Sequence, residues 1–380
     1  MQAKTARVCL GPWGLLFAVS ALSGCGGSGS PTPVPTPSHQ SSRFLYVVDS
    51  IASTVSAFSI NAANAGLTPV GPAVATADAP IYAAAAPNGR FLFVANAEID
   101  SSSVSAYVID QTTGALTPTT PATFSVHGDN QPLGIAVDAT STHVYTANLE
   151  SISAFNIDPV TGVLSDVPGT PVYTGRANTQ LQDAALTPDG RFVYATDEGN
   201  NLVWGYALNA AGLPVQPAVT VAAGSSPIGI VVDPAGKYVY VANWVSNDVS
   251  AYSITPATGI LVPIGAPVSV GTGCEPQELA VDPSSKHLFV ACFGLSTIAQ
   301  FSIQPATGAL TPVLPSFSPR PAAGPRGIAV DASGLFVYSA WNTQNRVGAA
   351  KIAPTGALTP ISGAPSTGSG PIGVVVSGLQ

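Results

Sequence analysis

Residues 227–243 read PIGIVVDPAGKYVYVAN and contain the pattern that decides the fold. Two apolar runs flank a Pro-Ala-Gly segment, which predicts a pair of antiparallel strands joined by a tight hairpin turn. Residues 249–254 (VSAYSI) alternate in polarity and indicate a third strand. A turn at Gly259 then leads to a short run containing proline, which an outer edge strand tolerates because it need not donate every N–H. The stretch therefore predicts one four-stranded antiparallel sheet.

The same unit recurs along the chain at intervals of 46 to 52 residues, starting at Pro80, Pro132, Leu181, Pro227, Pro276, Pro325 and Pro371. Repeats of this length, made of short strands, are typical of propeller blades. The first unit begins at once with a second-strand sequence, residues 44–48, whereas residues 371–376 are a lone first strand. We therefore expect an all-β, seven-bladed β-propeller with four antiparallel strands per blade. The C-terminal strand should close the ring by pairing with the N-terminal blade. An open solenoid is the alternative, but it leaves a bare strand edge.

Composition limits the partners of this chain. Hydrophobic residues make up 46% of the 380 residues and charged residues only 8%, with a formal net charge of −8. The basic residues are scattered, and no cluster is present that would neutralise phosphates. We therefore expect no nucleic-acid binding.

The N-terminus has the features of an export signal. Lys4 and Arg7 precede an apolar segment, residues 8–21, which is too short to span a bilayer as a mature helix. Leu22-Ser-Gly-Cys25 resembles a bacterial lipobox, which implies cleavage before Cys25 and lipid attachment to its thiol; an ordinary secretory signal is the alternative. We expect a signal peptide at residues 1–24, the lipidated Cys25 with a Gly/Ser/Pro tether at residues 25–42, and the propeller at residues 43–380.

These features predict a protein of the bacterial cell envelope, held to the membrane by lipid and facing the periplasm or the cell surface. Gly26 follows Cys25 where an Asp would resemble an inner-membrane retention signal. We therefore favour the outer membrane.

The repeat also resembles a known family. Tyr238–Asn243 is similar to the YVTN-type propeller repeat, and the wider unit looks like the seven-bladed lactonase family, which includes a propeller-type 6-phosphogluconolactonase. The resemblance covers residues 43–380 and implies a lactonase site at one mouth of the ring. Gln182 stands where the family has a histidine, while Asp197 and Gly199 match a later Asp-x-Gly. Glutamine has no group that titrates near neutral pH, so it cannot act as a general base.

A site is expected where first strands begin and second strands end, because these points meet around a central channel. The position two after each blade start is glycine in four copies, Gly134, Gly229, Gly327 and Gly373. We interpret these glycines as keeping the channel open, with Tyr82, Asp183 and Glu278 of the other copies projecting into it. The catalytic candidates are Gln182, Asp183, Asp197, Glu278 and Arg326. The binding candidates are Tyr82, Asn148, Asn243, Trp244, Gln277, Trp341 and Asn342. Turn capping is the alternative role for the asparagines, and core packing for the tryptophans.

Cofactors and cysteines complete the predictions. Asp183, Asp197, Glu198 and Glu278 offer oxygens suited to Ca²⁺, but no EF-hand-like spacing is present, so we expect neither a metal nor another cofactor. His127 lies in a loop near the mouth and is a second candidate base; the alternative, which we favour, is a surface histidine without a catalytic role. Cys274 and Cys292 flank a predicted hairpin, which favours a disulfide over two free thiols.

Two functions remain open at this stage. The first is a binding or scaffold module that presents a small-molecule, glycan or protein ligand site at the mouth of the channel. The alternative is a hydrolase of a sugar lactone with an altered active site. The replacement of the family histidine by Gln182 favours the first.

Overall fold

The computed structural model describes residues 44–127 and 131–377, all within the unit Ser41–Gln380. The predicted signal peptide, the tether and Cys25 lie outside the described residues. In the described part, no helix is long and apolar enough to cross a membrane.

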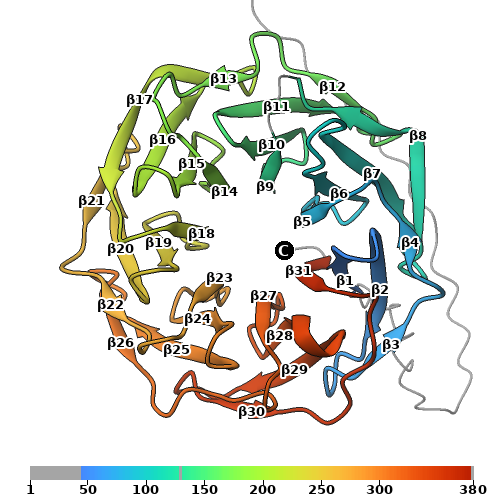
Figure 1. Ribbon diagram of the computed structural model, residues 1–380, viewed down its shortest axis with the longest axis vertical. Coiled ribbons are helices and arrows are strands. Elements are labelled where there is room, and N and C mark those ends of the chain that lie inside the picture. Colours follow the sequence, from blue (N-terminus) through green and yellow to red (C-terminus); the bar gives the residue numbers. More distant parts are fainter. Residues whose placement is uncertain (1–43, 128–130, 378–380) are drawn as a thin grey trace, which may run out of the picture. The chain divides into compact units, whose positions relative to one another are not determined.

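Seven antiparallel sheets form a ring around a central axis (Figure 1). Each sheet runs outward from an inner strand at the axis, as the repeat predicts. Blade 1 contains β31 (Pro371–Ser377), β1 (Phe44–Asp49), β2 (Thr54–Ile60), β3 (Leu67–Pro69) and β4 (Val74–Ala75). Blade 2 contains β5 (Pro80–Ala85), β6 (Phe91–Asn96), β7 (Ser103–Ile109) and β8 (Leu116–Ser125). Blade 3 contains β9 (Pro132–Val137), β10 (His143–Asn148), β11 (Ser151–Ile157), β12 (Leu164–Asp166) and β13 (Val172–Tyr173).

The other four blades repeat this plan. Blade 4 contains β14 (Leu181–Leu186), β15 (Phe192–Asp197), β16 (Leu202–Leu208) and β17 (Pro214–Ala222). Blade 5 contains β18 (Pro227–Val232), β19 (Tyr238–Asn243), β20 (Asp248–Ile254), β21 (Leu261–Pro263) and β22 (Val268–Ser269). Blade 6 contains β23 (Pro276–Val281), β24 (His287–Cys292), β25 (Thr297–Ile303) and β26 (Leu310–Pro312). Blade 7 contains β27 (Pro325–Val330), β28 (Phe336–Trp341), the 3-10 helix η1 (Asn342–Gln344), β29 (Arg346–Ile352) and β30 (Leu358–Pro360).

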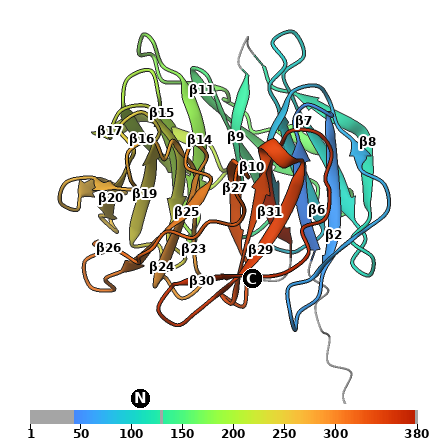
Figure 2. The same cartoon turned by 60° about the horizontal axis from the view of Figure 1, so that its bottom comes forward.

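The predicted ring closure is confirmed. β31 pairs antiparallel with β1, from Phe44 opposite Ser377 to Asp49 opposite Pro371. The final strand therefore supplies the inner strand of the first blade, and in the tilted view it lies beside β27 of blade 7 (Figure 2). This pairing covers the inner edge of β1, which would otherwise be exposed.

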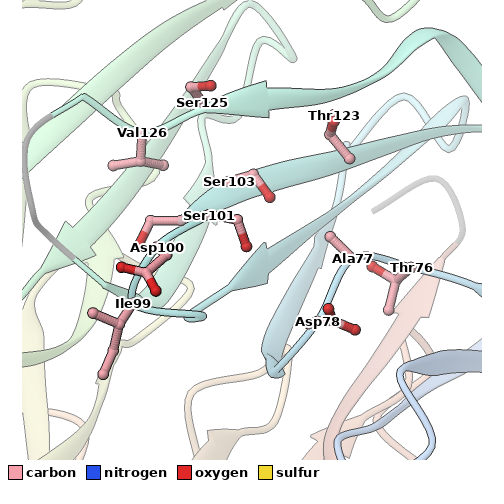
Figure 3. Close-up of a pocket in the computed structure, with 11 residues that line it drawn as sticks. Thr76, Ala77, Asp78, Ile99, Asp100, Ser101, Ser103, Thr123, Ser125 and Val126 are labelled. Atoms are coloured by element: carbon pink, nitrogen blue, oxygen red, sulfur yellow. The ribbon is translucent and has the colours of Figure 1, made fainter.

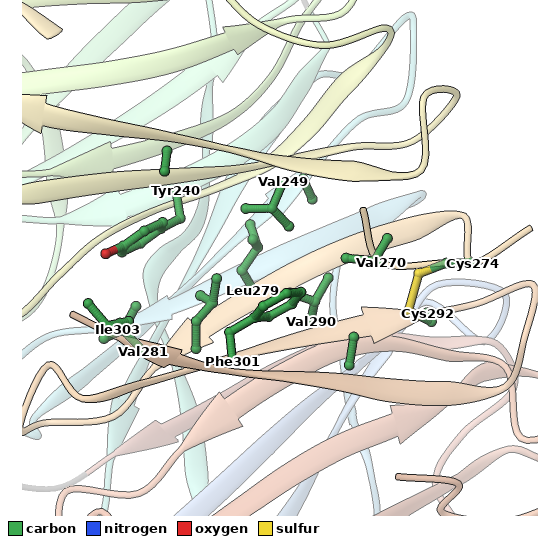
Figure 4. Close-up of a cluster of buried hydrophobic side chains, with 14 of the residues drawn as sticks. Tyr240, Val249, Val270, Cys274, Leu279, Val281, Val290, Cys292, Phe301 and Ile303 are labelled. Carbon is green, nitrogen blue, oxygen red and sulfur yellow. A yellow bond between two sulfur atoms is a disulfide. The ribbon is translucent and has the colours of Figure 1, made fainter. Parts of the chain in front are cut away.

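The core lies between neighbouring blades, which explains why the second strands have few polar residues. β6, β15, β19, β24 and β28 are buried at every residue because a blade covers each face. The cluster between blades 5 and 6 includes Tyr240, Val249, Leu279, Val290 and Phe301 (Figure 4). Burial of such side chains contributes roughly 1.5–3 kcal/mol each.

Buried tyrosines also join successive blades by hydrogen bonds. The hydroxyl of Tyr46 in β1 donates to the carbonyl of Gly114 in the next blade at 2.9 Å. Tyr145, Tyr194 and Tyr240 make the same bond to Gly212, Gly259 and Gly308. Each bond satisfies a buried hydroxyl and holds the glycine turn of the neighbouring blade in place.

Candidate functional site

The inner strands are irregular at the end where each begins. In all seven blades, the pairing of the inner strand with the second strand shifts register near the first residue of the inner strand. In blade 4, for example, Leu181 pairs with Asp197 but Ala184 pairs with Ala195. An extra residue of this kind re-aims the side chains beside it. This face of the ring, where inner strands begin and second strands end, is called the mouth below.

The role expected for the repeated glycines is wrong. A Cβ on Gly134 would lie 2.4 Å from Asp183 Cα, and a Cβ on Gly229 would lie 2.4 Å from the Gln277 carbonyl oxygen. Gly327 meets the backbone of Ile372 in the same way. These glycines allow neighbouring inner strands to approach each other, which is a packing role; an open channel is not what they provide.

Three larger side chains alternate with the glycines around the axis and interact with one another. The Tyr82 hydroxyl and the Glu278 carboxyl are close enough for each group to shift the pKa of the other. Burial, and then the charge of Asp183, raises the pKa of Glu278 well above its usual range. Burial likewise raises the pKa of Tyr82, and the charges of Glu278 and Asp183 add to this effect. Blades 2, 4 and 6 therefore bring these three residues together, as the sequence predicts.

Asp183 is the most enclosed of the three and has the best-defined contacts. Its Oδ1 accepts the Ala184 N–H at 2.8 Å and its Oδ2 accepts the Ile230 N–H of the next blade at 3.1 Å. Burial raises the pKa of Asp183 to about 7, although these two backbone hydrogen bonds lower it. Because the desolvation effect is the larger, the carboxyl changes protonation near neutral pH.

Gln182 and Arg326 occupy equivalent positions in blades 4 and 7 and are half-buried. Gln182 Nε2 donates to Glu198 Oε2 at 2.7 Å. The Arg326 guanidinium stacks on the Phe293 ring at 4.8 Å from its centroid, and its charge lowers the pKa of Tyr82. Arg326 forms no ion pair with Asp183 or Glu278 among the described residues, whose ion pairs involve other groups.

Phe293 was not predicted from the sequence. It directly follows β24 and occupies the repeat position that Trp244 has after β19. Aligning the repeats at this position is the signal that would have found it.

Asp197 has a role within its blade. Its side chain is fully buried and accepts from Trp204 Nε1 at 2.9 Å, from the Gln180 N–H at 3.0 Å and from the backbone and side chain of Asn200. Donors fill both oxygens, so this carboxylate holds the strand end and its turn.

Two of the candidate asparagines, Asn148 and Asn243, make contacts within their own blades, and the third, Asn342, contacts the next blade. Asn148 Nδ2 donates to Ser151 and Ser153, and Asn243 Nδ2 donates to Asp248 and Ser250. Both residues are fully buried. Asn342 is half-buried and donates to the Pro371 carbonyl at 3.1 Å. The contacts of Asn148 and Asn243 are those expected for the turn-capping alternative, whereas the contact of Asn342 joins blade 7 to blade 1.

The remaining binding candidates differ in exposure. Trp341 is buried against Gly348 and donates to Ser339, so it packs within blade 7. Trp244 is 38% exposed on the mouth-face turn after β19. Gln277 is buried, and its amide donates to the Glu275 carbonyl.

The histidines of the described residues lie away from the axis. His127 Nε2 contacts Asp166 in the outer strand β12 at 2.9 Å. His143 and His287 lie next to Asp138 and Asp282, at the starts of β10 and β24 on the face opposite the mouth. A histidine base at the axis is therefore missing from the part of the chain that the structure describes.

Cys274 and Cys292 form a disulfide beside the mouth end of blade 6. Within residues 44–127 and 131–377, no three His, Cys, Asp or Glu side chains gather closely enough to hold a metal ion. A surface pocket of about 700 Å³ lies apart from the axis, in blade 2, where Thr76, Asp78, Asp100, Ser101 and Ser125 are among its lining residues (Figure 3). None of the axial side chains contributes to it.

A family of seven-bladed propellers accounts for this arrangement. The family model described as "Lactonase, 7-bladed beta-propeller" matches residues 18–117, 102–275 and 274–373. The chain belongs to this family.

Relatives and solved structures agree with this assignment. The 6-phosphogluconolactonase of Bacillus subtilis is 29% identical over 191 residues, which are 47% of this chain and 53% of that relative. The 6-phosphogluconolactonase of Erwinia tasmaniensis is 25% identical over 182 residues, again 47% and 53%. The chain thus spans about half the length of the curated relatives it matches. The fold is similar to that of the periplasmic gluconolactonase of Pseudomonas aeruginosa, with a TM-score of 0.74, 19% identity, and coverage of 89% of this chain and 100% of that one. A protein from Lactobacillus plantarum gives a TM-score of 0.74 at 21% identity, covering 89% and 99%.

The preference for a binding or scaffold module is overturned by these findings. The curated relatives are named as lactonases, and the family model that matches the chain is described as a lactonase. They support the alternative drawn from the sequence, a lactonase. The replacement of the family histidine by Gln182 was therefore not sufficient ground for preferring a binding or scaffold role.

Proposed function

We propose that this protein is a lactonase that opens the ring of a sugar lactone, using side chains at the mouth end of the axis. The observation that carries the proposal is the pair of enclosed carboxyls, Asp183 and Glu278, which lie close enough for one charge to raise the pKa of the other. Such a pair holds a proton near neutral pH, so it supplies an acid and a base together.

The two carboxyls suit different halves of the reaction. Burial raises the pKa of both carboxyls, and the charge of Asp183 raises the pKa of Glu278 further, so we assign Asp183 as the carboxylate and Glu278 as the acid at neutral pH. Asp183 takes a proton from water as the water oxygen bonds to the lactone carbonyl carbon, whose oxygen gains the electron pair. As the carbonyl re-forms, the bond to the ring oxygen breaks and Glu278 gives its proton to that oxygen. The product is an open hydroxy acid.

Arg326 supports the developing oxyanion. Its guanidinium has no carboxylate partner among the described residues and is fixed over Phe293. A positioned cation in a partly desolvated site stabilises charge that forms during the reaction. The axis thus provides acid, base and electrophile without the family histidine.

Proton release from glucono-1,5-lactone, measured against the spontaneous rate, tests this function. Asp183→Asn and Glu278→Gln should each lower kcat/KM by about 10²- to 10⁴-fold. In the unsubstituted protein, kcat/KM should increase with pH around pH 7 as Asp183 loses its proton. Asp183→Asn should abolish this pH dependence. The matched control is Glu150→Gln, an exposed acid on the same face. Activity that is unchanged in both site variants, or no turnover above the blank, would refute the proposal.

The proposal also covers the cellular location of the protein and its cofactor requirement. Lys4, Arg7 and the Leu22–Cys25 motif support export and lipid attachment at Cys25, with the outer membrane favoured by Gly26. Cys25→Ser should move the protein from the membrane fraction to the soluble fraction. The lactonase should need no metal, so turnover should persist in EDTA; loss of activity restored by Ca²⁺ would contradict this.

A further inference from the structure

The charged groups around the axis are mostly acidic. Asp183 and Glu278 lie at the axis, and Glu198 lies next to Gln182 at the mouth. The cation near these acidic residues is Arg326, whose charge lowers the pKa of the neighbouring Tyr82. Even with one proton retained by the carboxyl pair, the acidic charge exceeds the basic charge here.

Three of the other cations in the described chain are hydrogen-bonded away from the axis. Arg90 and Arg191 bond the carbonyls of Pro159 and Pro256 on the face opposite the mouth. Arg346 bonds the Ala364 carbonyl at the outer part of blade 7. The remaining cations within residues 44–127 and 131–377 are Arg176, Lys237, Lys286, Arg320 and Lys351.

Two of these, Arg176 and Arg320, lie in loops that lead to the mouth. Arg176 is exposed and donates to Asn200 Oδ1 at 3.2 Å, and Arg320 is exposed before β27. Neither has a contact with the axial side chains.

We infer that the axial site selects lactones that carry no phosphate, so that its substrates are uncharged polyhydroxy lactones. This inference rests on the proposed lactonase function, and it departs from the substrate named for the curated relatives. A phosphate monoester carries a charge of about −1.5 to −2 at neutral pH and is bound where several cations or helix N-termini converge. The described part of this axis offers one guanidinium and a surplus of carboxylate, which repels such a group.

The guanidinium of Arg326 is already assigned to the oxyanion of the lactonase reaction. Arg326 is half-buried and stacked on Phe293, so its planar face is covered and its N–H edge is available for one acceptor. Its Nε is buried without a hydrogen-bond partner. A lactone carbonyl oxygen bound at the terminal N–H groups of the guanidinium gains negative charge in the reaction, whereas a phosphate bound there would occupy the position the oxyanion needs.

The experiment compares kcat/KM for glucono-1,5-lactone and 6-phosphoglucono-1,5-lactone on the full chain, at low and high ionic strength. We expect kcat/KM to be at least about tenfold higher for the neutral lactone at low salt. This ratio should decrease as salt screens the repulsion between the acidic residues and the phosphate. Glu198→Gln should narrow the preference several-fold at low salt, and the Glu150→Gln control should leave the ratio unchanged. Inorganic phosphate should not inhibit competitively.

Arg326→Gln separates the two uses of the guanidinium. An oxyanion role predicts that both lactones lose kcat/KM by a similar factor, while a phosphate anchor predicts that the phosphorylated lactone loses far more. A preference for 6-phosphoglucono-1,5-lactone, or a selective loss of that substrate in Arg326→Gln, would overturn the inference and leave the lactonase function intact. Turnover of neither lactone would instead overturn the proposed function.

Discussion

Gly134 of β9 lies against Asp183 of β14 so closely that a Cβ at position 134 would be 2.4 Å from Asp183 Cα. The glycine thus sets the distance between two inner strands and, through it, the position of the carboxyl assigned as the base. Gly373 is the matched comparison, because a Cβ there would meet the nearest atom at 3.1 Å.

Gly134→Ala should therefore destabilise the fold far more than Gly373→Ala. We expect a loss of about 3 kcal/mol in the free energy of unfolding for the first and about 1 kcal/mol for the second, since overpacked backbone has to shift. Urea unfolding followed by tryptophan fluorescence measures both. Equal losses for the two variants would contradict the close approach of blades 3 and 4.

The pH dependence of stability should carry the signature of Asp183. Its pKa is raised from 3.8 to about 7 on folding, so the folded state binds a proton that the unfolded state has released between these values. Stability should then fall as pH rises from about 4 to 7, and this group should account for a loss on the order of 3 kcal/mol. Below pH 4 the carboxyl is protonated in both the folded and the unfolded state, so its contribution should no longer change with pH.

The difference in unfolding free energy between the unsubstituted protein and Asp183→Asn isolates this contribution, because Asn does not titrate. Urea titrations at several pH values should give a difference that changes between pH 4 and 7 and is flat on either side. A difference that is independent of pH across this range would show that the carboxyl is solvated.

Asp197 should behave as a structural residue, although the sequence made it a catalytic candidate. Asp197→Ala leaves the buried donors of Trp204 and Gln180 without an acceptor and should cost about 3 kcal/mol of unfolding free energy. The adjacent, half-buried Glu198 is the control: Glu198→Gln should change stability by about 0.5 kcal/mol or less. An unchanged unfolding midpoint together with lost lactonase activity in Asp197→Ala would restore it to the catalytic candidates.

The disulfide should contribute mainly by restricting the unfolded chain. Cys274 and Cys292 are 18 residues apart, for which chain entropy gives a stabilisation of about 3 kcal/mol. Dithiothreitol should lower the urea midpoint of the unsubstituted protein to that of the Cys274→Ala/Cys292→Ala double variant, which should itself not respond to the reductant. Two reactive thiols at these positions in the unreduced protein would exclude the bond.

The sequence predicts the ring but only part of the site, for a physical reason. Blade number, strand order and closure follow from a period that every copy shares. The strands that begin at Phe44 and Pro371 belong to one blade because the repeat places them there, independently of the direction of their side chains. The convergence of Tyr82, Asp183 and Glu278 follows from the same register.

What the register does not contain is the direction of each side chain at an irregular strand end. The register shift near each blade start turns the glycine Cα–H toward a neighbouring strand, so Gly134 is a spacer between blades. The donors to Asp197 come from Trp204 on another strand, and the support of Arg326 comes from Phe293 on another blade. Such contacts between different strands depend on side-chain directions that the repeat pattern does not contain.

Closure by β31 can be tested by removing it and then restoring it in another order. Without residues 371–380, β1 exposes its inner edge and blade 1 loses the strand that packs against β5 and β27. We expect this truncated protein to lose cooperative unfolding, or to unfold at a much lower urea concentration.

A circular permutant supplies the matched control. Because Ser377 lies opposite Phe44, a short Asn-Gly turn joining residues 377 and 44 makes β31 and β1 a hairpin like those of the other blades. With new ends after Ser369 and before Gly370, this permutant keeps every strand and should unfold within about 1 kcal/mol of the unsubstituted protein, since only the connection changes. A truncated protein as stable as this permutant would mean that the ring does not depend on the pairing of its two ends.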